Sequence, residues 1–444
     1  MGGMNDYGCD GTGGVPPKNT APVTRRAVLH GGALTLAAAL AAWTNRSALA
    51  QIAVSPSPPA GERDVLINLF LRGAADGLSL VVPHGEDEYY RARPTLAIAA
   101  PKAGNAGAAL ALNGFFGLHP ALAPLLPLYK EGELAVLHAV GSGDQTRSHF
   151  EAMATMERGD YAGGGAGGSG WLTRHLDAVP PLTGTASPLR AVALGTVMPD
   201  TLRGATDATA VDSLSDFRLR VPNPGMEAAL RGLYAHGNDA ASAAGRETLA
   251  VLDTLRRIDP AHYKPANGAV YPASPLGDGL KQAACLVKAR VGLEAAFLDR
   301  TGWDTHVGQG GATGWLALQL GDVAQSLAAF AQDLGAEKRR VTVIVQTEFG
   351  RRVAENSSLG TDHGRAGAMF VWGGGVNGGK VYANWPGLKP EQLEQPGDLR
   401  VTTDYRVVLA EVLAKRCGNV AHLGDVFPGA DLSPGRFLGV ARAI

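Results

Sequence analysis

Five uninterrupted runs of apolar residues constrain the fold of this chain more than any other feature. The first is VLINLFL at 65–71, which ends at the turn-forming sequence RGAADG. Continuous apolarity without alternation is typical of strands that are covered on both faces, and such strands belong to parallel sheets. Four later runs have the same character: LAVLHAV at 134–140, AVAL at 191–194, VTVIVQT at 341–347 and AMFVW at 368–372.

Helical patterns lie between these runs. The clearest spans 314–335, where apolar residues recur at three- and four-residue steps, at Leu316, Leu320, Val323, Leu327, Phe330 and Leu334. A second spans 403–416 and begins at Thr403 or Asp404. We also expect a helix that ends near Arg300. Helices that alternate with buried strands predict an α/β fold, a doubly wound, mostly parallel sheet flanked by helices.

Two glycine-rich stretches have no phosphate-binding context. GDYAGGGAGGSG at 159–170 lacks the preceding strand and following helix, so we expect a surface loop. GGGVNGGKVYANWPG at 373–387 favours a turn and hairpin after a strand. No repeat of fixed period occurs, which disfavours solenoids and propellers. No G-x-G-x-x-G follows the first strand, so a nucleotide-binding oxidoreductase is also disfavoured.

The N-terminal stretch TRRAVLHGGALTLAAALAAWTNRSALA has the order of an export signal. Arg25 and Arg26 precede an Ala/Leu-rich segment, and Ala48-Leu49-Ala50 is a small-x-small cleavage sequence. The arginine pair predicts a twin-arginine signal that the twin-arginine translocase recognises, with cleavage near Ala50. The alternative is a basic N-terminal helix of the folded domain. The expected location is periplasmic or secreted.

The chain then divides into three parts. Residues 1–50 are the expected twin-arginine signal, 51–62 a Pro/Ser linker, and 63–444 a single α/β domain. The formal net charge of -1 gives no electrostatic reason to expect nucleic acid. Beyond the N-terminal region no apolar run is long enough to predict a membrane span.

Three cysteines are present, and Cys9 lies upstream of the expected cleavage site. A disulfide between Cys285 and Cys417 is possible in an oxidising compartment. Neither residue lies in a C-x-P-x-R sequence, so formylglycine-based sulfatase chemistry is excluded.

Polar residues that follow the buried runs are the candidate site, because ligands of open α/β sheets bind beyond the carboxyl ends of the strands. They are Asp76, Thr146, Arg147, Ser148, His149, Asp304, His306, Glu348, Asp362 and His363. Carboxylates mixed with imidazoles suit Zn, Mn or Fe. The predicted metal ligands are Asp76, Asp304, His306, Glu348, Asp362 and His363.

Each position also has a structural alternative. SHFE at 148–151 is a capping box, so Ser148 could simply begin a helix. The others are a turn at Asp76–Gly77, an ion pair of Glu348 with Arg351 or Arg352, a turn cap at Asp362, and a structural role for His306.

Six motifs carry a resemblance to a known family: RGAADGLSLVVP, TRSHFEAM, GWDTH, QTEFGR, GTDHG and GGGVNGGKVY. They resemble the signature stretches of domain-of-unknown-function family 1501, an exported family placed in the alkaline-phosphatase and sulfatase-like superfamily. The resemblance spans about 63–440. It implies a parallel sheet between helices with a two-metal hydrolase-type site.

The resemblance also implies roles for individual residues. Asp76 matches the acid that bridges the nucleophile and a second metal, and Thr146 or Ser148 matches the nucleophile. Asp304 and His306 match an Asp-x-x-x-His pair, although their spacing here is Asp-x-His.

Glu348 and Phe349 occupy the place of the superfamily's Asp-His pair, so phenylalanine replaces one histidine. His363 then matches the later, isolated histidine. The expectation is one ordinary metal site from Asp304, His306 and His363, and a second, poorer site from Asp76 and Glu348.

The predicted function is that of an exported metal-dependent hydrolase of phosphate or sulfate esters, with activity weakened by the lost ligand. Its substrate would be a small-molecule or polymer ester. Ser148, or else Thr146, would attack, and Arg147 would hold the non-bridging oxygens. The alternative is a non-catalytic secreted scaffold or binding protein that retains the fold and one metal.

Overall fold

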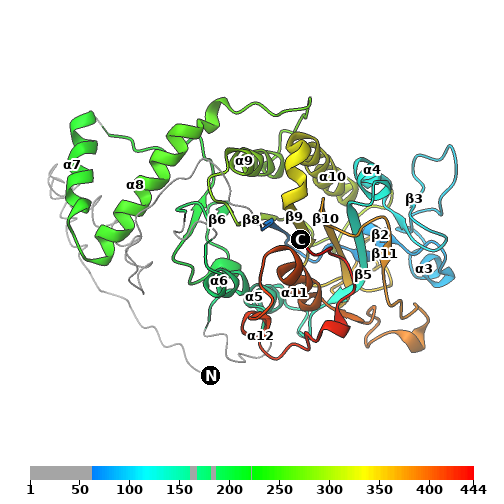
Figure 1. Ribbon diagram of the computed structural model, residues 1–444. Coiled ribbons are helices and arrows are strands. Elements are labelled where there is room, and N and C mark those ends of the chain that lie inside the picture. Colours follow the sequence, from blue (N-terminus) through cyan, green and yellow to red (C-terminus); the bar gives the residue numbers. More distant parts are fainter. Residues whose placement is uncertain (1–62, 161–167, 182–186, 222) are drawn as a thin grey trace, which may run out of the picture.

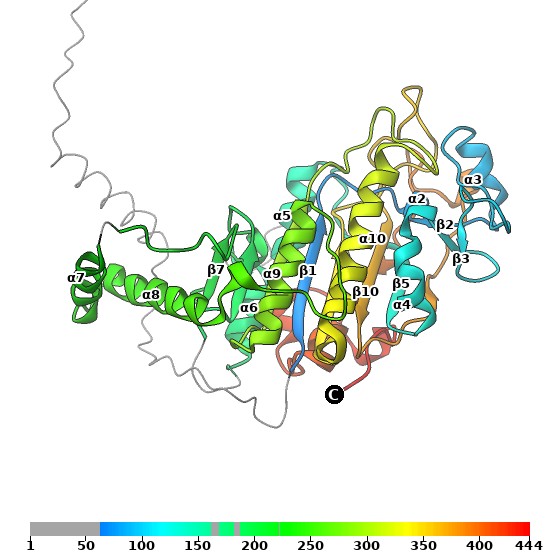
Figure 2. The same cartoon turned by 90° about the horizontal axis from the view of Figure 1, so that it is seen from above.

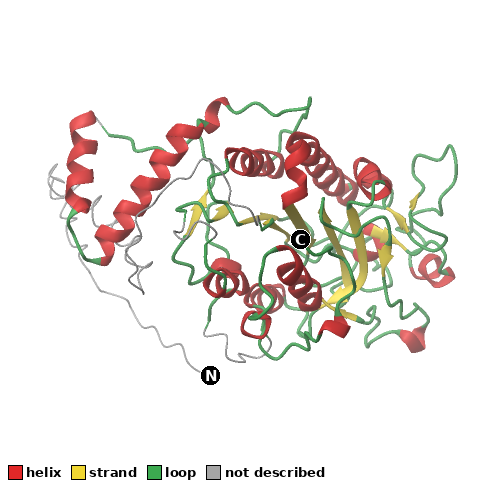
Figure 3. Cartoon of the chain, in the orientation of Figure 1, coloured by secondary structure: helices red, strands yellow, loops and turns green. Residues whose placement is uncertain are grey.

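A nine-stranded, mostly parallel sheet flanked by helices forms the centre of the molecule (Figures 1 and 3). The computed structural model describes residues 63–160, 168–181, 187–221 and 223–444. The predicted export signal (1–50), the linker (51–62) and most of the first glycine-rich stretch lie outside the described residues.

The strand order in this sheet is β11-β5-β10-β9-β1-β8-β6-β7, and β12 also pairs with β5. Every strand pair is parallel except those of β10, which runs antiparallel to both β5 and β9. The strands are β1 (Val65–Leu71), β5 (Leu134–Gly141), β6 (Ala191–Leu194), β7 (Ala208–Val211), β8 (Ala295–Arg300), β9 (Val341–Gln346), β10 (Gly367–Gly373), β11 (Val381–Tyr382) and β12 (Thr403–Asp404). A small second sheet joins β2 (Val81–Val82), β4 (Gly117–Leu118) and β3 (Leu110–Ala111).

The five apolar runs form β1, β5, β6, β9 and β10, as the sequence predicts. In β1 every residue is buried, because β8 and β9 pair with its two edges and helices cover its two faces. Val65, Ile67 and Leu69 belong to one core cluster, whereas Leu66 and Phe70 belong to another. Two cores on opposite faces explain why the run lacks alternation.

Helices cover both faces of the sheet (Figure 1). One face carries α4 (Leu126–Lys130), α9 (Pro275–Ala289) and α10 (Trp315–Leu334). The other carries α5 (His149–Arg158), α6 (Trp171–Ala178), α11 (Tyr405–Arg416) and α12 (Leu423–Val426). The apolar stripe predicted at 314–335 is buried along α10, and the Asp404 side chain caps α11 by accepting from the Arg406 N–H.

The remaining helices lie at the edges. Short helices α2 (Gly77–Leu80) and α3 (Asp87–Ala92) follow β1, whereas α7 (Pro224–Ala235) and α8 (Ala240–Ile258) extend away from the sheet beyond β7 (Figure 2). The 3-10 helices are Pro120–Leu125, Asp200–Leu202, Pro260–His262, Gly335–Arg340, Pro390–Gln392 and Pro434–Arg436.

Two sequence-based expectations about elements are wrong. The helix expected to end near Arg300 is strand β8, because pairing with β1 and β6 outweighs the helix propensity of its Ala and Leu residues. The hairpin expected at 373–387 does not form. Its strand β11 pairs in parallel with β5 and not with β10, since the Gly-rich turn carries the chain across to the sheet edge.

Cys285 and Cys417 are both buried, free thiols in this structure. The disulfide that the sequence allowed between them is therefore not formed here. Within the described part of the chain, no helix combines the length and the apolarity that crossing a membrane requires.

Candidate functional site

The candidate site lies where β1, β5, β8 and β9 end. These four strands are parallel to one another, since β5 and β9 both run antiparallel to β10. The segments that follow them therefore meet at one edge of the sheet. They supply His149 at the start of α5, Asp304 and His306 after β8, and Glu348 and His363 after β9.

Three imidazoles converge on one carboxylate oxygen. Oδ1 of Asp304 lies 3.1 Å from Nε2 of His306, 3.3 Å from Nε2 of His363 and 3.5 Å from Nε2 of His149. Nε2 of His306 and Nε2 of His363 are 2.8 Å apart. Of these side chains, those of His149, Asp304 and His363 offer ligand atoms that all lie within 4.8 Å of one another.

The opposite nitrogen of each ring faces an oxygen acceptor. Nδ1 of His149 lies 2.7 Å from Oε1 of Glu348, and Nδ1 of His363 lies 2.8 Å from the Arg147 carbonyl oxygen. Nδ1 of His306 lies 3.3 Å from Oδ1 of Asp362. These acceptors assign the ring protons to Nδ1, which leaves three Nε2 lone pairs directed at the same place.

This arrangement fits a divalent metal ion. Ligand atoms that share an ion at ~2.0–2.2 Å lie roughly 3 Å apart, as Oδ1 of Asp304 and the Nε2 atoms of His306 and His363 do here. Two imidazole lone pairs at 2.8 Å repel each other unless a cation or a proton lies between them. Nε2 of His149 is buried and has no hydrogen-bond partner, so it is an uncommitted donor atom aimed into the cluster.

The charge of the cluster is set by Arg351. Its Nη2 donates to Oδ1 of Asp304 at 2.7 Å and to the Gly73 carbonyl at 2.6 Å, while its Nε donates to the Ala74 carbonyl at 2.8 Å. Burial acts to raise the pKa of Asp304, but the hydrogen bond and charge of Arg351, together with His306 and His363, lower it to about 2. Asp304 is therefore an anion at neutral pH.

The other pKa shifts follow from the same neighbours. The hydrogen bond that His149 donates to Glu348 raises the pKa of His149 against the effect of burial. Burial lowers the pKa of His363, although the Arg147 carbonyl opposes it. A hydrogen bond from Asn356 holds the pKa of Asp362 below its usual value.

One side of the cluster is open to solvent. The Asp304 side chain is 47% exposed, whereas that of Glu348 is fully buried beneath His149. A ligand can approach Asp304, His306 and His363 from outside, whereas Nε2 of His149 is buried and the carboxylate that orients His149 stays protected from water.

Glu348 is committed to positioning. Oε1 accepts from His149 and from the Gly73 N–H at 2.8 Å, and Oε2 accepts from the Thr347 hydroxyl at 2.9 Å. Phe349, the next residue, stacks on the His149 ring with centroids 5.0 Å apart. Both residues therefore fix the His149 imidazole.

Asp76 belongs to a buried network beside the cluster. Its carboxylate forms a buried bidentate ion pair with Arg93 and accepts from the Ser79 hydroxyl at 2.6 Å. Burial would raise the pKa of Asp76, but the charge of Arg93 and these hydrogen bonds lower it overall. Asp76 and Glu348 thus lie in separate hydrogen-bond networks, and their joint use as a second metal site stays a prediction.

Gln309 connects the Asp76 network to the loops of the cluster. Its Nε2 donates to Oδ2 of Asp76 at 2.8 Å, and its Oε1 accepts from the hydroxyls of Thr305 at 2.8 Å and Thr361 at 2.6 Å. Thr305 lies between Asp304 and His306, and Thr361 precedes Asp362. The network therefore positions both ligand-bearing loops.

The predicted catalytic segment 146–148 lies at the start of α5. Ser148 occupies the N-cap position without a side-chain capping bond, so the SHFE capping box does not form. The Thr146 hydroxyl donates to Asp144 at 2.6 Å. Nε of Arg147 donates to Asp398 at 2.7 Å and its Nη2 to the Gln395 carbonyl at 2.8 Å. The Arg147 guanidinium is thus bound to Asp398 and Gln395, and only the Arg147 carbonyl contacts the cluster, through Nδ1 of His363.

His149 is the site residue that sequence reasoning left out of the metal ligands, although it stands in the TRSHFEAM motif directly after Ser148. Its partner Glu348 is 199 residues away. The sequence feature that indicates His149 as a ligand is its place at the first position of a helix that follows a buried strand.

Fold and site together define an α/β protein with an imidazole–carboxylate cluster at the carboxyl edge of its sheet. The model of the family described as "Protein of unknown function (DUF1501)" matches residues 132–415. The chain belongs to this family. A comparison with curated proteins finds no match.

Proposed function

We propose that the chain is an exported, metal-dependent hydrolase of phosphate or sulfate esters. The observation that carries the proposal is the convergence of three Nε2 atoms on Oδ1 of Asp304, with an oxygen acceptor behind each ring. We also propose an alkaline-phosphatase and sulfatase-like kinship for the fold. The mostly parallel sheet and the position of the cluster at its carboxyl edge support this kinship.

His149, His306, His363 and Asp304 would hold the ion, for which Zn, Mn and Fe suit the donor set. A bound divalent ion polarises ester oxygens and lowers the pKa of coordinated water or hydroxyl. Glu348 holds the proton of His149 at Nδ1, which keeps Nε2 free to coordinate. The exposed side of Asp304 leaves room for the ester.

Ser148 is the proposed nucleophile. It precedes His149 at the N-terminus of α5, where the backbone N–H groups of a ten-residue helix favour negative charge on a phosphate or sulfate. Its hydroxyl is not used as a helix cap. The Thr146 hydroxyl is bound to Asp144 and is the weaker candidate.

A second candidate function is a non-catalytic secreted scaffold or binding protein that retains one metal. The observation in its favour is that the predicted ester-binding guanidinium of Arg147 is committed to Asp398 and Gln395. Export through the twin-arginine translocase to the periplasm or beyond belongs to both proposals.

Hydrolysis of p-nitrophenyl phosphate and p-nitrophenyl sulfate by metal-loaded protein separates the two functions. The hydrolase proposal expects turnover that disappears on chelation, and a fall in kcat of more than about 1,000-fold in Ser148→Ala. Thr146→Ala is the matched control and should retain most activity. Bound metal without turnover of any ester, in the wild type and Ser148→Ala alike, would support the scaffold.

A further inference from the structure

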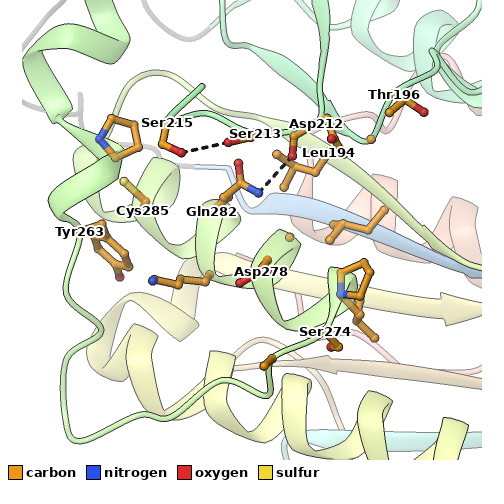
Figure 4. A pocket seen from close by; sticks show the side chains of 18 of the residues that line it. Leu194, Thr196, Asp212, Ser213, Ser215, Tyr263, Ser274, Asp278, Gln282 and Cys285 are labelled. Atoms are coloured by element: carbon orange, nitrogen blue, oxygen red, sulfur yellow. Dashed lines mark hydrogen bonds between the residues drawn. The ribbon is translucent and has the colours of Figure 1, made fainter. Parts of the chain in front are cut away.

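A cavity of ≈ 850 Å³ opens at the carboxyl ends of β6, β7 and β8, on the same sheet edge as the imidazole cluster (Figure 4). Leu194 ends β6, Asp212 follows β7, and Asp299 lies near the end of β8. Ser274, the N-cap of α9, closes another side. The volume lies within the ~300–1,000 Å³ of ligand sites and far exceeds the needs of one ion.

Asp212, Asp278 and Lys281 place charged side chains at this cavity. Among the described residues, none forms a side-chain hydrogen bond or ion pair with Asp212, Asp278 or Lys281. The loop that bears Asp212 is nevertheless fixed, because Gln282 accepts from the Leu214 N–H at 2.6 Å and donates to the Asp212 carbonyl at 3.3 Å (Figure 4). The loop that lines the cavity is therefore fixed in place, and the three charged side chains are available to a ligand.

The lining favours a neutral, hydroxyl-rich ligand. Asp212, Asp278 and Asp299 outnumber Lys281 in the lining, so the cavity would repel a phosphate or sulfate. An apolar ligand would remove water from these carboxylates without replacing their hydrogen bonds. Hydroxyl groups instead donate to carboxylates in short, strong hydrogen bonds. The half-buried Tyr263 adds a ring against which the C–H face of a sugar can pack.

A smaller cavity adjoins this one, and two residues of its lining are sequence neighbours of residues at the imidazole cluster. Its volume is ≈ 360 Å³, and it shares Asp299 with the larger cavity. Its lining includes Arg72 and Phe150. Arg72 precedes Gly73, whose N–H binds Glu348, and Phe150 follows His149 in α5. The Phe150 side chain is 84% exposed, so an apolar surface is available beside the cluster.

We propose that the larger cavity binds the remote, neutral part of an extended oligosaccharide substrate. This inference rests on the proposed ester hydrolase function. The ester group of the same molecule would lie at the imidazole cluster, and the smaller cavity would take the sugar unit between them. The substrate class is thus an oligosaccharide or polysaccharide ester whose charge is confined to the reacting end.

Binding of unesterified sugars tests the cavity without any turnover. The probes are maltohexaose, cellohexaose, xylohexaose and chitohexaose, with hexalysine as a cationic comparison, titrated into the full mature chain by calorimetry. At least one hexasaccharide should bind, and Asp212→Asn with Asp278→Asn should weaken it by about tenfold or more. Glu391→Gln, an exposed acid elsewhere, should leave affinity unchanged.

The outcomes separate this inference from the proposed function. The sugar site would be overturned if no hexasaccharide bound, or if the wild type and the double variant bound hexasaccharides with equal affinity. Binding of hexalysine alone would overturn it as well. If the site is correct, the double variant should keep the wild-type rate on p-nitrophenyl esters. Failure of the wild type on every ester, with sugar binding intact, would instead reject the hydrolase and leave a sugar-binding protein.

Discussion

At the residue scale, the cluster depends on what lies behind each imidazole. Glu348, Asp362 and the Arg147 carbonyl each face an Nδ1 atom and so direct an Nε2 lone pair toward Asp304. Such partners raise the basicity of the ring and restrict its rotation. The Glu348 contact is the shortest of the three, at 2.7 Å, and the most deeply buried.

Glu348→Gln should therefore weaken metal binding. The amide keeps the size of the side chain but removes its negative charge, and loss of such a partner typically costs ~10–100-fold in affinity. Competition with a metal-sensitive chelator measures the change. Glu133→Gln is a matched control, because Glu133 forms its ion pair with Lys338 away from the site. Equal affinities for the two variants would show that Glu348 does not support His149.

Asp76→Asn should destabilise the protein whether or not metal is present. The substitution leaves the Arg93 charge buried without its partner, and such losses cost about 3–5 kcal/mol. Urea unfolding of the chelated and metal-loaded forms measures both cases. If Asp76 were a metal ligand, the loss would be confined to the metal-loaded form, and the chelated protein would keep its stability.

Residue roles at the site were only partly predictable from the sequence. Asp304, His306 and His363 are predicted as ligands because they follow buried segments, and the structure brings them together. Asp76 follows a strand end as well, yet its carboxylate forms an ion pair with Arg93. Which carboxylate meets an arginine and which meets an imidazole is decided by contacts far apart in sequence, and no local pattern encodes them.

At the element scale, the buried strands were predictable because both of their faces are covered. The strands β1, β5, β6, β9 and β10 appear within one or two residues of the apolar runs. The strand β8 was not predictable, since its Ala and Leu residues also suit a helix, and pairing with β1 and β6 decides the outcome. Prediction of a strand from the sequence fails in this way where the β propensity of its residues is weak and its pairing partners are distant in the chain.

The strand β5 also carries a group that should make stability depend on pH. Burial lowers the pKa of His138 to about 4, from 6.5 for the free side chain. Its Nε2 faces the Val81 carbonyl and its Nδ1 accepts from the Ala139 N–H, so the neutral ring is fully bonded and a second proton would face a donor. The folded state therefore resists protonation at a pH where the unfolded state accepts it.

Because the pKa of His138 is lower in the folded state than in the unfolded state, the folded protein loses stability as the pH falls. The contribution of His138 is complete above pH 6.5 and falls between pH 6.5 and about 4 by ~1.4 kcal/mol per unit, about 3 kcal/mol in total. Urea unfolding of the wild type and His138→Gln across this range measures it. The variant should lose less stability on acidification. Parallel curves for both proteins would show that His138 does not carry the effect.

At the scale of the whole molecule, the sheet order explains why the site exists. β1 lies between β8 and β9, so the segments after these three strands meet, and β5 brings α5 to the same edge. The parallel sheet and its ligand-bearing edge could be expected from the sequence. The strand order, the displacement of α7 and α8 and the two cavities could not, because they arise from long-range pairing and from loops without a periodic pattern.

The proposed centre of the site is one divalent ion held by three histidines and Asp304. X-ray absorption at the metal edge, on protein loaded with zinc, manganese or iron, tests it most directly. We expect one ion per chain with three imidazole nitrogens and a carboxylate oxygen at ~2.0–2.2 Å, and loss of the ion in the double variant His306→Ala with His363→Ala. Protein that retains no ion, or an ion without imidazole ligands, would contradict it.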